Sequence, residues 1–279
     1  MHAGSALPPL DRVALGEGLL LSVLAAGAAI LEIYAQDFAV EWKADHSPVT
    51  AADAAGEAII LADLARLAPG VPVVAEEEAA AGRVPLCGRR FFLVDPLDGT
   101  KEFVQRRGDF TVNIALIEEG VPTLGLVYAP ARGDVFFGDG ARGEAWAARL
   151  GPDGLGARRP LCVRAASPEA LAVVASKSHC NAATDAYLAA LPVGERVSCG
   201  SSLKFCLVAD GEADVYPRLS PTMEWDTAAG DAVLRAAGGG VFGPDGAPLR
   251  YNKARFFNPG FVACGGVSAP PVGPFLKTE

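Results

Sequence analysis

The stretch FFLVDPLDGTKEF, residues 91–103, runs from a continuous apolar segment directly into two aspartates, Asp95 and Asp98. On an uninterrupted strand, this odd spacing would point the two carboxylates to opposite faces of a sheet. We expect Pro96 to stop the strand and Gly99 to allow a tight bend, so that both carboxylates turn toward one point. Two unpartnered carboxylates held close together repel each other, and a bound Mg²⁺ would remove that repulsion. The alternative is a solvated Asp-Pro turn that binds no cation.

The composition limits the partners that the chain can have. With 279 residues, of which 51% are hydrophobic, the chain can fill a substantial core. It carries 24 Lys and Arg against 33 Asp and Glu, a net charge of −9, and has no cluster of basic residues. This argues against polymeric nucleic acid as a partner. The six cysteines include no C-x-x-C pair, the pattern of reduced thiols in a cytoplasmic protein.

The most apolar segment extends from Gly18 to Leu31, between Glu17 and Glu32. This run is shorter than the ~20 residues that a membrane span needs, so we expect a buried helix and no transmembrane segment. The charges that precede it do not form the basic region of a signal peptide. The sequence shows no lipidation motif or basic patch for peripheral contact with the inner membrane, and it leaves the oligomeric state open.

Periodicity and turn signals predict an α/β protein. We expect helices over residues 11–36 and 50–68, and the second opens with Thr50 and Asp53 at the spacing of a capping box. A short strand and an acidic loop follow in PVVAEEE, then a strand in RRFFLVDP and two hairpins in TVNIALIEEGVPTLGLVYAP and GDVFFGDGARGEAWAA. Beyond them, strand-like and helix-like pieces alternate, which favours a layered α/β arrangement.

The polar, glycine-rich segment RLGPDGLGARRP is the best candidate for a linker. It divides the chain into an N-terminal α+β portion over residues 8–150 and a C-terminal α/β portion over residues 160–267. We expect residues 268–279 to form a loose tail.

The absence of several motifs narrows the chemistry. The only histidines are His2, His46 and His179, so no H-x-x-x-H metal site exists. The chain also lacks a G-x-S-x-G elbow, a G-x-x-x-x-G-K-[ST] loop and a cysteine followed by arginine six positions later, as a cysteine-dependent phosphatase requires. What remains is a set of carboxylates at the ends of predicted elements.

Three further carboxylates fit that description. Glu76 follows the short strand in VVAEEE, Asp226 stands where a helix begins in WDTAAG, and Asp53 lies in the first turn of its helix. Each of the three also has a purely structural interpretation. Glu76 could lie in a solvated acidic loop, Asp226 could be a helix N-cap, and Asp53 could be the capping partner of Thr50.

Taken in order, these motifs resemble those of the lithium-sensitive, magnesium-dependent inositol monophosphatase superfamily. The stretches KADHSPVTAAD, LVDPLDGTKEF, SKSH, GSSLKFCLVADGEADVYPR and EWDTAAGDAV are similar, more closely, to those of its bacterial 3'(2'),5'-bisphosphate nucleotidases. The resemblance covers residues 43–263, nearly the whole globular part, and the ordered set is far more specific than DPLDGT alone.

The resemblance implies a layered α/β/α/β/α sandwich with two or three Mg²⁺ ions at one edge. Glu76, Asp95 and the Leu97 carbonyl would hold the first ion, Asp95, Asp98 and Asp226 the second, and Glu76 a third. The family's activated water maps to Thr100, hydrogen-bonded to Asp53, and its phosphate cradle maps to the amides of Gly99 and Thr100. A two-metal site of this kind stabilises the attacking and leaving oxygens and needs no phosphoenzyme, which suits a chain without a nucleophilic cysteine motif.

The resemblance also implies contacts at the adenosine-phosphate end of the substrate, from Ser176, His179, Gly200 and Lys204. Physically, Lys204 and the backbone of Gly200, Ser201 and Ser202 suit a second phosphate. The two serines are alternatively a helix N-cap, and His179 an exposed loop histidine. Arg218 is a further candidate for phosphate contact, with a surface salt bridge as its alternative.

The resemblance implies a Mg²⁺-dependent phosphatase that removes the 3'-phosphate of adenosine 3',5'-bisphosphate (PAP) to give AMP in sulfur assimilation. The sulfated form PAPS is a second candidate substrate. The first alternative is an inositol or sugar phosphatase acting, for example, on fructose 1,6-bisphosphate. DGTKEF and GSSLKF favour the nucleotide, because inositol phosphatases more often have Thr-Asn-Phe after the glycine. A catalytically dead nucleotide or metal sensor is the second alternative, and the intact carboxylate set argues against it.

Overall fold

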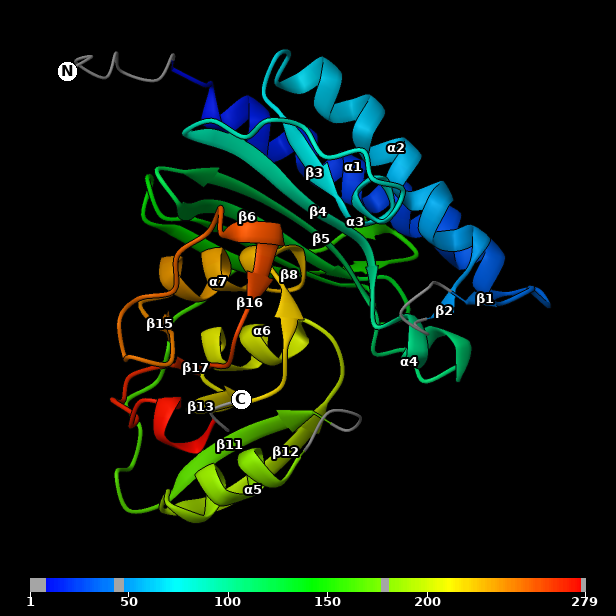
Figure 1. The fold of residues 1–279 in the computed structure, drawn as a ribbon. Coiled ribbons are helices and arrows are strands. Elements are labelled where there is room, and N and C mark those ends of the chain that lie inside the picture. Colours follow the sequence, from blue (N-terminus) through cyan, green and yellow to red (C-terminus); the bar gives the residue numbers. More distant parts are fainter. Residues whose placement is uncertain (1–8, 43–47, 177–180, 277–279) are drawn as a thin grey trace.

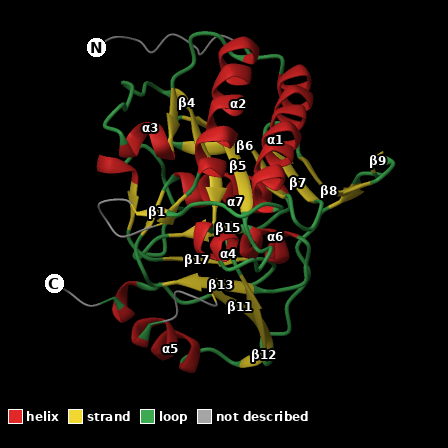
Figure 2. Ribbon diagram, turned by 90° about the vertical axis from the view of Figure 1, so that its right-hand side faces the viewer, coloured by secondary structure: helices red, strands yellow, loops and turns green. Residues whose placement is uncertain are grey.

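The computed structural model describes residues 9–42, 48–176 and 181–276. Its elements form five layers: a helix pair, a large sheet, a second helix pair, a smaller sheet and a single helix (Figures 1 and 2). The predicted α/β/α/β/α sandwich is therefore confirmed.

The first layer consists of α1 (Arg12–Tyr34) and α2 (Ala51–Leu67), which lie side by side on one face of the large sheet (Figure 1). Both helices match the predicted ranges. By length and composition alone, α1 could cross a membrane, and half of its most apolar window is buried inside the protein. Leu19, Val23 and Ile30 are completely buried. This is the packing of a core helix, as the sequence predicted.

The large sheet has the strand order β10-β8-β7-β6-β5-β4-β3, with β9 paired to β8. Only β3 and β4 are parallel within this order. The strands are β3 (Val73–Ala75), β4 (Arg90–Asp98), β5 (Thr111–Glu118), β6 (Val121–Ala129), β7 (Asp134–Asp139), β8 (Glu144–Gly151), β9 (Gly154–Leu155) and β10 (Arg159–Pro160). Both predicted hairpins are present, as β5–β6 and β7–β8.

Two segments differ from their predicted structure. The expected acidic loop is a short helix, α3 (Glu76–Ala80). The segment expected as a linker carries β9 and β10, which are both hydrogen-bonded to β8, so it extends the large sheet.

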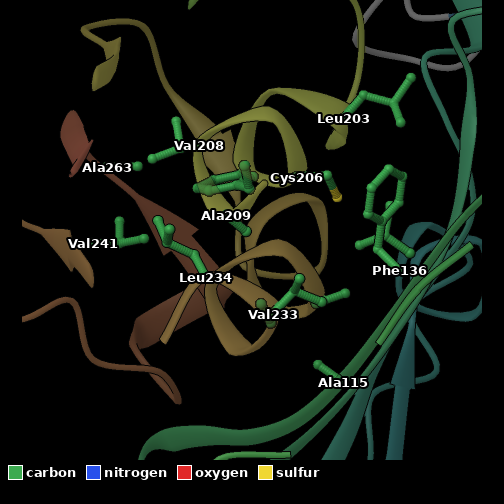
Figure 3. Packing of buried hydrophobic residues seen from close by; sticks show 14 of the residues in the cluster. Ala115, Phe136, Leu203, Cys206, Val208, Ala209, Val233, Leu234, Val241 and Ala263 are labelled. Atoms are coloured by element: carbon green, nitrogen blue, oxygen red, sulfur yellow. The ribbon is translucent and has the colours of Figure 1, made fainter. Parts of the chain in front are cut away.

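The middle layer holds α6 (Leu203–Ala209) and α7 (Trp225–Ala236). The second helix packs closely on the large sheet because Gly125 of β6 has no side chain; a Cβ there would lie 2.5 Å from the Ala229 carbonyl oxygen. Figure 3 shows Phe136 of the large sheet facing Cys206 of α6 across this core. One apolar cluster therefore joins the large sheet, the middle helices and the smaller sheet.

The smaller sheet has the order β12-β11-β13-β17-β15. Its strands are β11 (Leu171–Ser176), β12 (Val193–Cys199), β13 (Val215–Arg218), β15 (Gly240–Phe242) and β17 (Phe261–Cys264). The last layer, α5 (Ala182–Ala189), lies on its outer side (Figure 1). Two short ribbons complete the fold, β1 (Glu41–Trp42) with β2 (Pro48–Val49) and β14 (Thr222–Met223) with β16 (Phe257–Asn258).

The expected loose tail is folded over residues 268–276, so that prediction was wrong for this part. The Tyr187 hydroxyl of α5 donates to the Pro270 carbonyl at 2.7 Å, and its ring meets Phe275 edge-on at 5.1 Å. Phe275 ends the 3₁₀ helix η2 (Gly273–Phe275), and Val272 before it is completely buried. Apolar contacts to α5 therefore order a segment whose prolines suggested a tail. Residues 277–279 lie outside the described residues.

Candidate active site

A polar pocket of about 190 Å³ opens at the end of β4. Its walls come from segments far apart in the chain, which include α3, the short helix α4 (Thr100–Val104), the start of α6 and the first turn of α7. The lining residues are Pro48, Glu76, Asp95, Leu97, Asp98, Gly99, Thr100, Lys101, Glu102, Ser201, Lys204, Arg218 and Asp226. We call this cavity the acidic pocket. It brings together the sequence-predicted residues of the described chain, except Asp53, Ser176, Gly200 and Ser202. Of these, Asp53 and Ser202 are hydrogen-bonded to the lining residues Thr100 and Asp98.

The two aspartates of β4 reach the same pocket by a bulge. We expected Pro96 to end the strand, but β4 continues to Asp98 with a register shift, since Asp95 pairs with Asn113 while Asp98 pairs with Thr111. Three steps on β4 thus match two steps on β5, and the extra residue cancels the odd spacing. Gly99 then turns the chain with φ of +91°, as expected. The bulge, rather than a strand end, therefore turns both carboxylates to one side.

Four carboxylates line the acidic pocket: Glu76, Asp95, Asp98 and Asp226. Burial raises the pKa of Asp95 well above its usual value, and the charges of the other three raise it further. Burial and the charge of Asp98 likewise raise the pKa of Asp226 to about 6. Such shifts mark a cluster of acids whose mutual repulsion and burial outweigh the positive charges nearby.

The donor set suits a hard cation. Among the described residues, no three or more His, Cys, Asp or Glu side chains form a ready-made cage around one point. Mg²⁺ does not need such a cage, because it keeps several waters and takes one or two protein carboxylates together with substrate phosphate. The pocket offers only oxygen donors for this purpose, the four carboxylates and the Leu97 carbonyl. Its residues therefore fit Mg²⁺ in donor type and charge.

Hydroxyl groups hold two of the carboxylates in place. Oδ2 of Asp98 accepts hydrogen bonds from Ser201 Oγ at 2.6 Å and Ser202 Oγ at 2.8 Å. Oδ2 of Asp226 accepts from the Met223 amide at 3.0 Å and from the Thr222 hydroxyl. Ser202 occupies the N-cap position of α6, as the alternative allowed, but its side chain makes no cap hydrogen bond.

Asp53 makes the contacts expected for both of its predicted roles. Its Oδ2 accepts from the Thr50 amide at 2.8 Å and the Thr50 hydroxyl at 2.9 Å, which completes the capping box of α2. Its Oδ1 lies 3.3 Å from Thr100 Oγ1, which is also 3.2 Å from the Leu97 carbonyl. The helix cap therefore holds the Asp53 carboxylate in an orientation that faces the Thr100 hydroxyl.

The basic residues of the acidic pocket are Lys204 and Arg218, together with Lys101. Lys204 is 2% exposed, and its ammonium donates to the Ser201 carbonyl at 2.6 Å. Arg218 Nη2 donates to the Pro221 carbonyl at 3.2 Å, while its buried Nε has no acceptor within the described chain. No carboxylate forms the alternative salt bridge with Arg218 in that part of the chain. Ser176 ends β11, but its side chain and all of His179 lie outside the described residues.

Two buried acids beside the acidic pocket were missed in the sequence analysis. Glu57, 4% exposed, accepts the amides of Glu77 at 2.9 Å and Glu78 at 3.0 Å, and so fixes the start of α3 beside Glu76. Its position four residues after Asp53, on the same face of α2, was an available signal. Asp109 is 3% exposed and accepts the Gly200 amide at 3.2 Å and a bond from Arg132. No local pattern marks Asp109.

Known proteins share this fold and much of the sequence. The family profile described as inositol monophosphatase family matches residues 18–262. The 3'(2'),5'-bisphosphate nucleotidase CysQ of Escherichia coli K12 is 48% identical over 239 residues, which cover 85% of this chain and 94% of the relative. The CysQ of Haemophilus influenzae is 32% identical over 257 residues, 88% of this chain and 91% of the relative.

Solved structures give the same result. CysQ from Bacteroides thetaiotaomicron superposes with a TM-score of 0.76 at 38% identity, covering 92% of this chain and 98% of the other. An inositol monophosphatase from Anabaena has a TM-score of 0.72 at 26% identity, covering 95% and 94%. The chain therefore belongs to the inositol monophosphatase family, a family of metal-dependent phosphatases.

Proposed function

We propose that this protein is a cytoplasmic, Mg²⁺-dependent phosphatase that hydrolyses the 3'-phosphate of PAP to give AMP and phosphate, in the service of sulfur assimilation. One observation carries the proposal: the four carboxylates and the Asp53–Thr100 pair meet in one pocket of a chain 48% identical to relatives named 3'(2'),5'-bisphosphate nucleotidase. PAPS, which shares the 3'-phosphate, is a second substrate within this proposal.

The carboxylates are proposed to hold two or three Mg²⁺ ions. Glu76, Asp95 and the Leu97 carbonyl take the first ion, and Asp95, Asp98 and Asp226 take the second. Glu76 would also contribute to a third ion. When bound, the cations neutralise the acidic cluster, polarise the phosphate and lower the pKa of a coordinated water.

Thr100 and Asp53 are proposed to orient the attacking water. The Thr100 hydroxyl has a single proton, which it can donate either to Asp53 Oδ1 or to the Leu97 carbonyl. When it donates to Asp53, its lone pairs are available to accept a hydrogen bond from water. The proton that leaves the water can then pass to Thr100 Oγ1 as the original proton passes to Asp53 Oδ1.

The substrate phosphates are proposed to meet two groups of donors. The amides of Gly99 and Thr100, at the start of α4, face the reacting phosphate, because the first amides of a helix have no partner inside it. Lys204, Arg218 and the loop of Gly200, Ser201 and Ser202 meet the second phosphate. Ser176 and His179 complete this end of the substrate in the proposal.

The testing experiment compares phosphate release from PAP, inositol 1-phosphate and fructose 1,6-bisphosphate, with Mg²⁺ and with EDTA. We expect the highest kcat/KM for PAP, complete loss in EDTA and inhibition by lithium. Asp95→Asn should abolish turnover while circular dichroism shows a folded protein, whereas Asp185→Asn, an exposed acid in the first turn of α5, should retain it. Release that survives EDTA refutes the metal requirement. A preference for inositol 1-phosphate or fructose 1,6-bisphosphate refutes the nucleotide assignment.

A further inference from the structure

Three buried polar side chains occupy alternate positions along β5 and the residues that lead into it. They are Asp109, Thr111 and Asn113, and each is at most 3% exposed. Alternate residues of a strand point to the same face of its sheet. We call these three residues the polar row. None of the roles proposed above for cations, water or phosphate belongs to it.

The polar row contacts the loop before α6 one residue after another. The contacts are from Asp109 Oδ2, which accepts the Gly200 amide at 3.2 Å, from the Thr111 hydroxyl to the Ser201 hydroxyl, and from Asn113 Nδ2, which donates to Ser202 Oγ at 2.9 Å. Three alternate residues of one segment thus meet three consecutive residues of another. This match holds the loop against the large sheet at three points.

The loop needs this support because its conformation is unusual. Ser201 has φ of +53°, a left-handed conformation that costs free energy outside glycine. Gly200 packs so closely that a Cβ on it would lie 2.7 Å from the Asp109 Cβ. Asp109 is itself held by a hydrogen bond from Arg132. The polar row therefore fixes a backbone conformation that the loop does not favour by itself.

The two serines of the loop extend this support to Asp98. Both hydroxyls are hydrogen-bonded to Asp98 Oδ2, Ser201 at 2.6 Å and Ser202 at 2.8 Å. An ionised carboxylate can only accept, and a hydroxyl has one proton, so a serine that donates to Asp98 must accept from its other partner. Thr111 and Asn113 are the groups that donate. Two chains of hydrogen bonds thus run from β5 through a serine to the same carboxylate oxygen.

The bulge in β4 places the polar row opposite the acids. In the register of β4 and β5, Asp98 pairs with Thr111 and Asp95 pairs with Asn113. One strand therefore presents two carboxylates to the acidic pocket, and its neighbour presents the donors that orient one of them. Hydrogen-bond partners of this kind fix the orientation of a metal-binding side chain.

We propose that Thr111 and Asn113 are positioning residues for the metal site. Acting through Ser201 and Ser202, they hold the Asp98 carboxylate in the orientation that a divalent cation requires. The inference rests on the proposed function, which assigns Asp98 to Mg²⁺, and adds the residues that orient it. Loss of such partners typically lowers metal affinity or activity roughly 10–100-fold.

The test measures Mg²⁺ affinity from the rise in Tm as MgCl₂ is added without substrate, so each variant is compared with its own metal-free form. Thr111→Val keeps the shape but removes the hydroxyl, and it should weaken Mg²⁺ binding about tenfold. Thr111→Ser should restore most of the affinity. Asn113→Leu tests the second chain and should weaken Mg²⁺ binding to a similar extent.

The matched control is Thr123→Val on β6 of the same sheet. It removes a hydroxyl that donates to Glu118 at 2.7 Å, and Thr123 does not line the acidic pocket. This variant should lower Tm without changing Mg²⁺ affinity. A loss of affinity in Thr123→Val as large as in Thr111→Val would overturn the inference, because the effect would then follow from stability alone.

A double-mutant cycle tests whether Thr111 acts through Ser201. In a protein that already carries Ser201→Ala, Thr111→Val should cost little further affinity. Its full effect in that background, or unchanged Mg²⁺ affinity in both Thr111→Val and Asn113→Leu, would overturn the inference. Phosphate release from PAP is measured on the same preparations. Wild-type hydrolysis of PAP with unchanged affinities in the variants refutes only the positioning role, whereas the expected shifts in a protein that does not hydrolyse PAP refute the proposed function and retain that role.

Discussion

Asp226→Asn should stabilise the metal-free protein while it removes activity. Burial and the charge of Asp98 raise the pKa of Asp226 to about 6 from 3.8. Because the folded pKa lies above the unfolded one, the stability associated with this group is complete below pH 4 and is lost as the pH rises through 6. At pH 7.5 the ionised carboxylate thus opposes folding until a cation is bound. An amide removes this charge and keeps an oxygen that can accept from the Met223 amide.

The magnitude follows from the size of the pKa shift. A pKa difference of one unit between the folded and unfolded protein corresponds to about 1.4 kcal/mol. The rise from 3.8 to about 6 therefore means that ionised Asp226 lowers the free energy of unfolding by about 3 kcal/mol at pH 7.5. Asp226 also lies in the first turn of α7, where losing a negative charge costs about 0.3–1 kcal/mol. We therefore expect a net gain of about 2 kcal/mol, which raises Tm by roughly 4–8 °C in a protein of this size.

The assay is thermal unfolding in EDTA at pH 5.0 and 7.5, followed by titration with MgCl₂. We expect the variant to exceed the wild type at pH 7.5, to exceed it by about half as much at pH 5.0, which lies between the two pKa values, and to gain less from Mg²⁺. The control is Asp185→Asn, which changes the same residue type in the first turn of α5 at an exposed position and should show no such pH dependence. A variant less stable than the wild type in EDTA at pH 7.5 would refute the reasoning.

Three further predictions test separate parts of the structure. Thr100→Val removes the hydroxyl that faces Asp53 and should lower kcat by about 10²-fold or more, while Thr100→Ser should restore most of it; equal rates for valine and serine would contradict the role of the hydroxyl. Glu57→Gln weakens the hydrogen bonds from the amides of Glu77 and Glu78 that hold the start of α3, and it should raise the Mg²⁺ concentration for half-maximal activity several-fold. An unchanged dependence of activity on Mg²⁺ would show that Glu57 does not influence the metal site. Gly125→Ala forces a Cβ toward the Ala229 carbonyl and should cost about 1–3 kcal/mol in urea unfolding, whereas Gly151→Ala, with nothing within 4 Å, should cost far less.

Local patterns predicted the parts of the fold that local interactions determine. The bounds of α1 and α2 agree with the predicted ranges to within two residues because apolar spacing and caps are encoded within each helix. The hairpins followed from their turn residues. The capping box of Thr50 and Asp53 formed as its spacing indicated. These features need no information about distant residues.

The mispredicted parts depend on contacts between distant segments. The acidic stretch that starts at Glu76 is helical because Glu57, from the preceding helix, accepts two of its amides. The C-terminal segment is ordered because Tyr187 contacts Phe275 and Pro270. The bulge in β4 depends on its register with β5. Proline and glycine signals in the sequence identified where the chain bends but not which partner fixes the bend.

The spacing of the carboxylates depends on the packing between layers. Asp98 comes from the large sheet and Asp226 from the middle helices, and Ser202 contacts both, with its Oγ 2.8 Å from Asp98 Oδ2 and 3.0 Å from the Asp226 carbonyl. The Ser202 hydroxyl has one proton and can donate it to only one of these two acceptors at a time. Its Oγ in turn accepts a hydrogen bond from the Asn113 side-chain amide at 2.9 Å. The first turns of α7, which carry Asp226, also pack closely on the large sheet at Gly125. A short motif such as DPLDGT therefore supplies ligands, but only the packed layers can place them at a distance that shared cations can bridge.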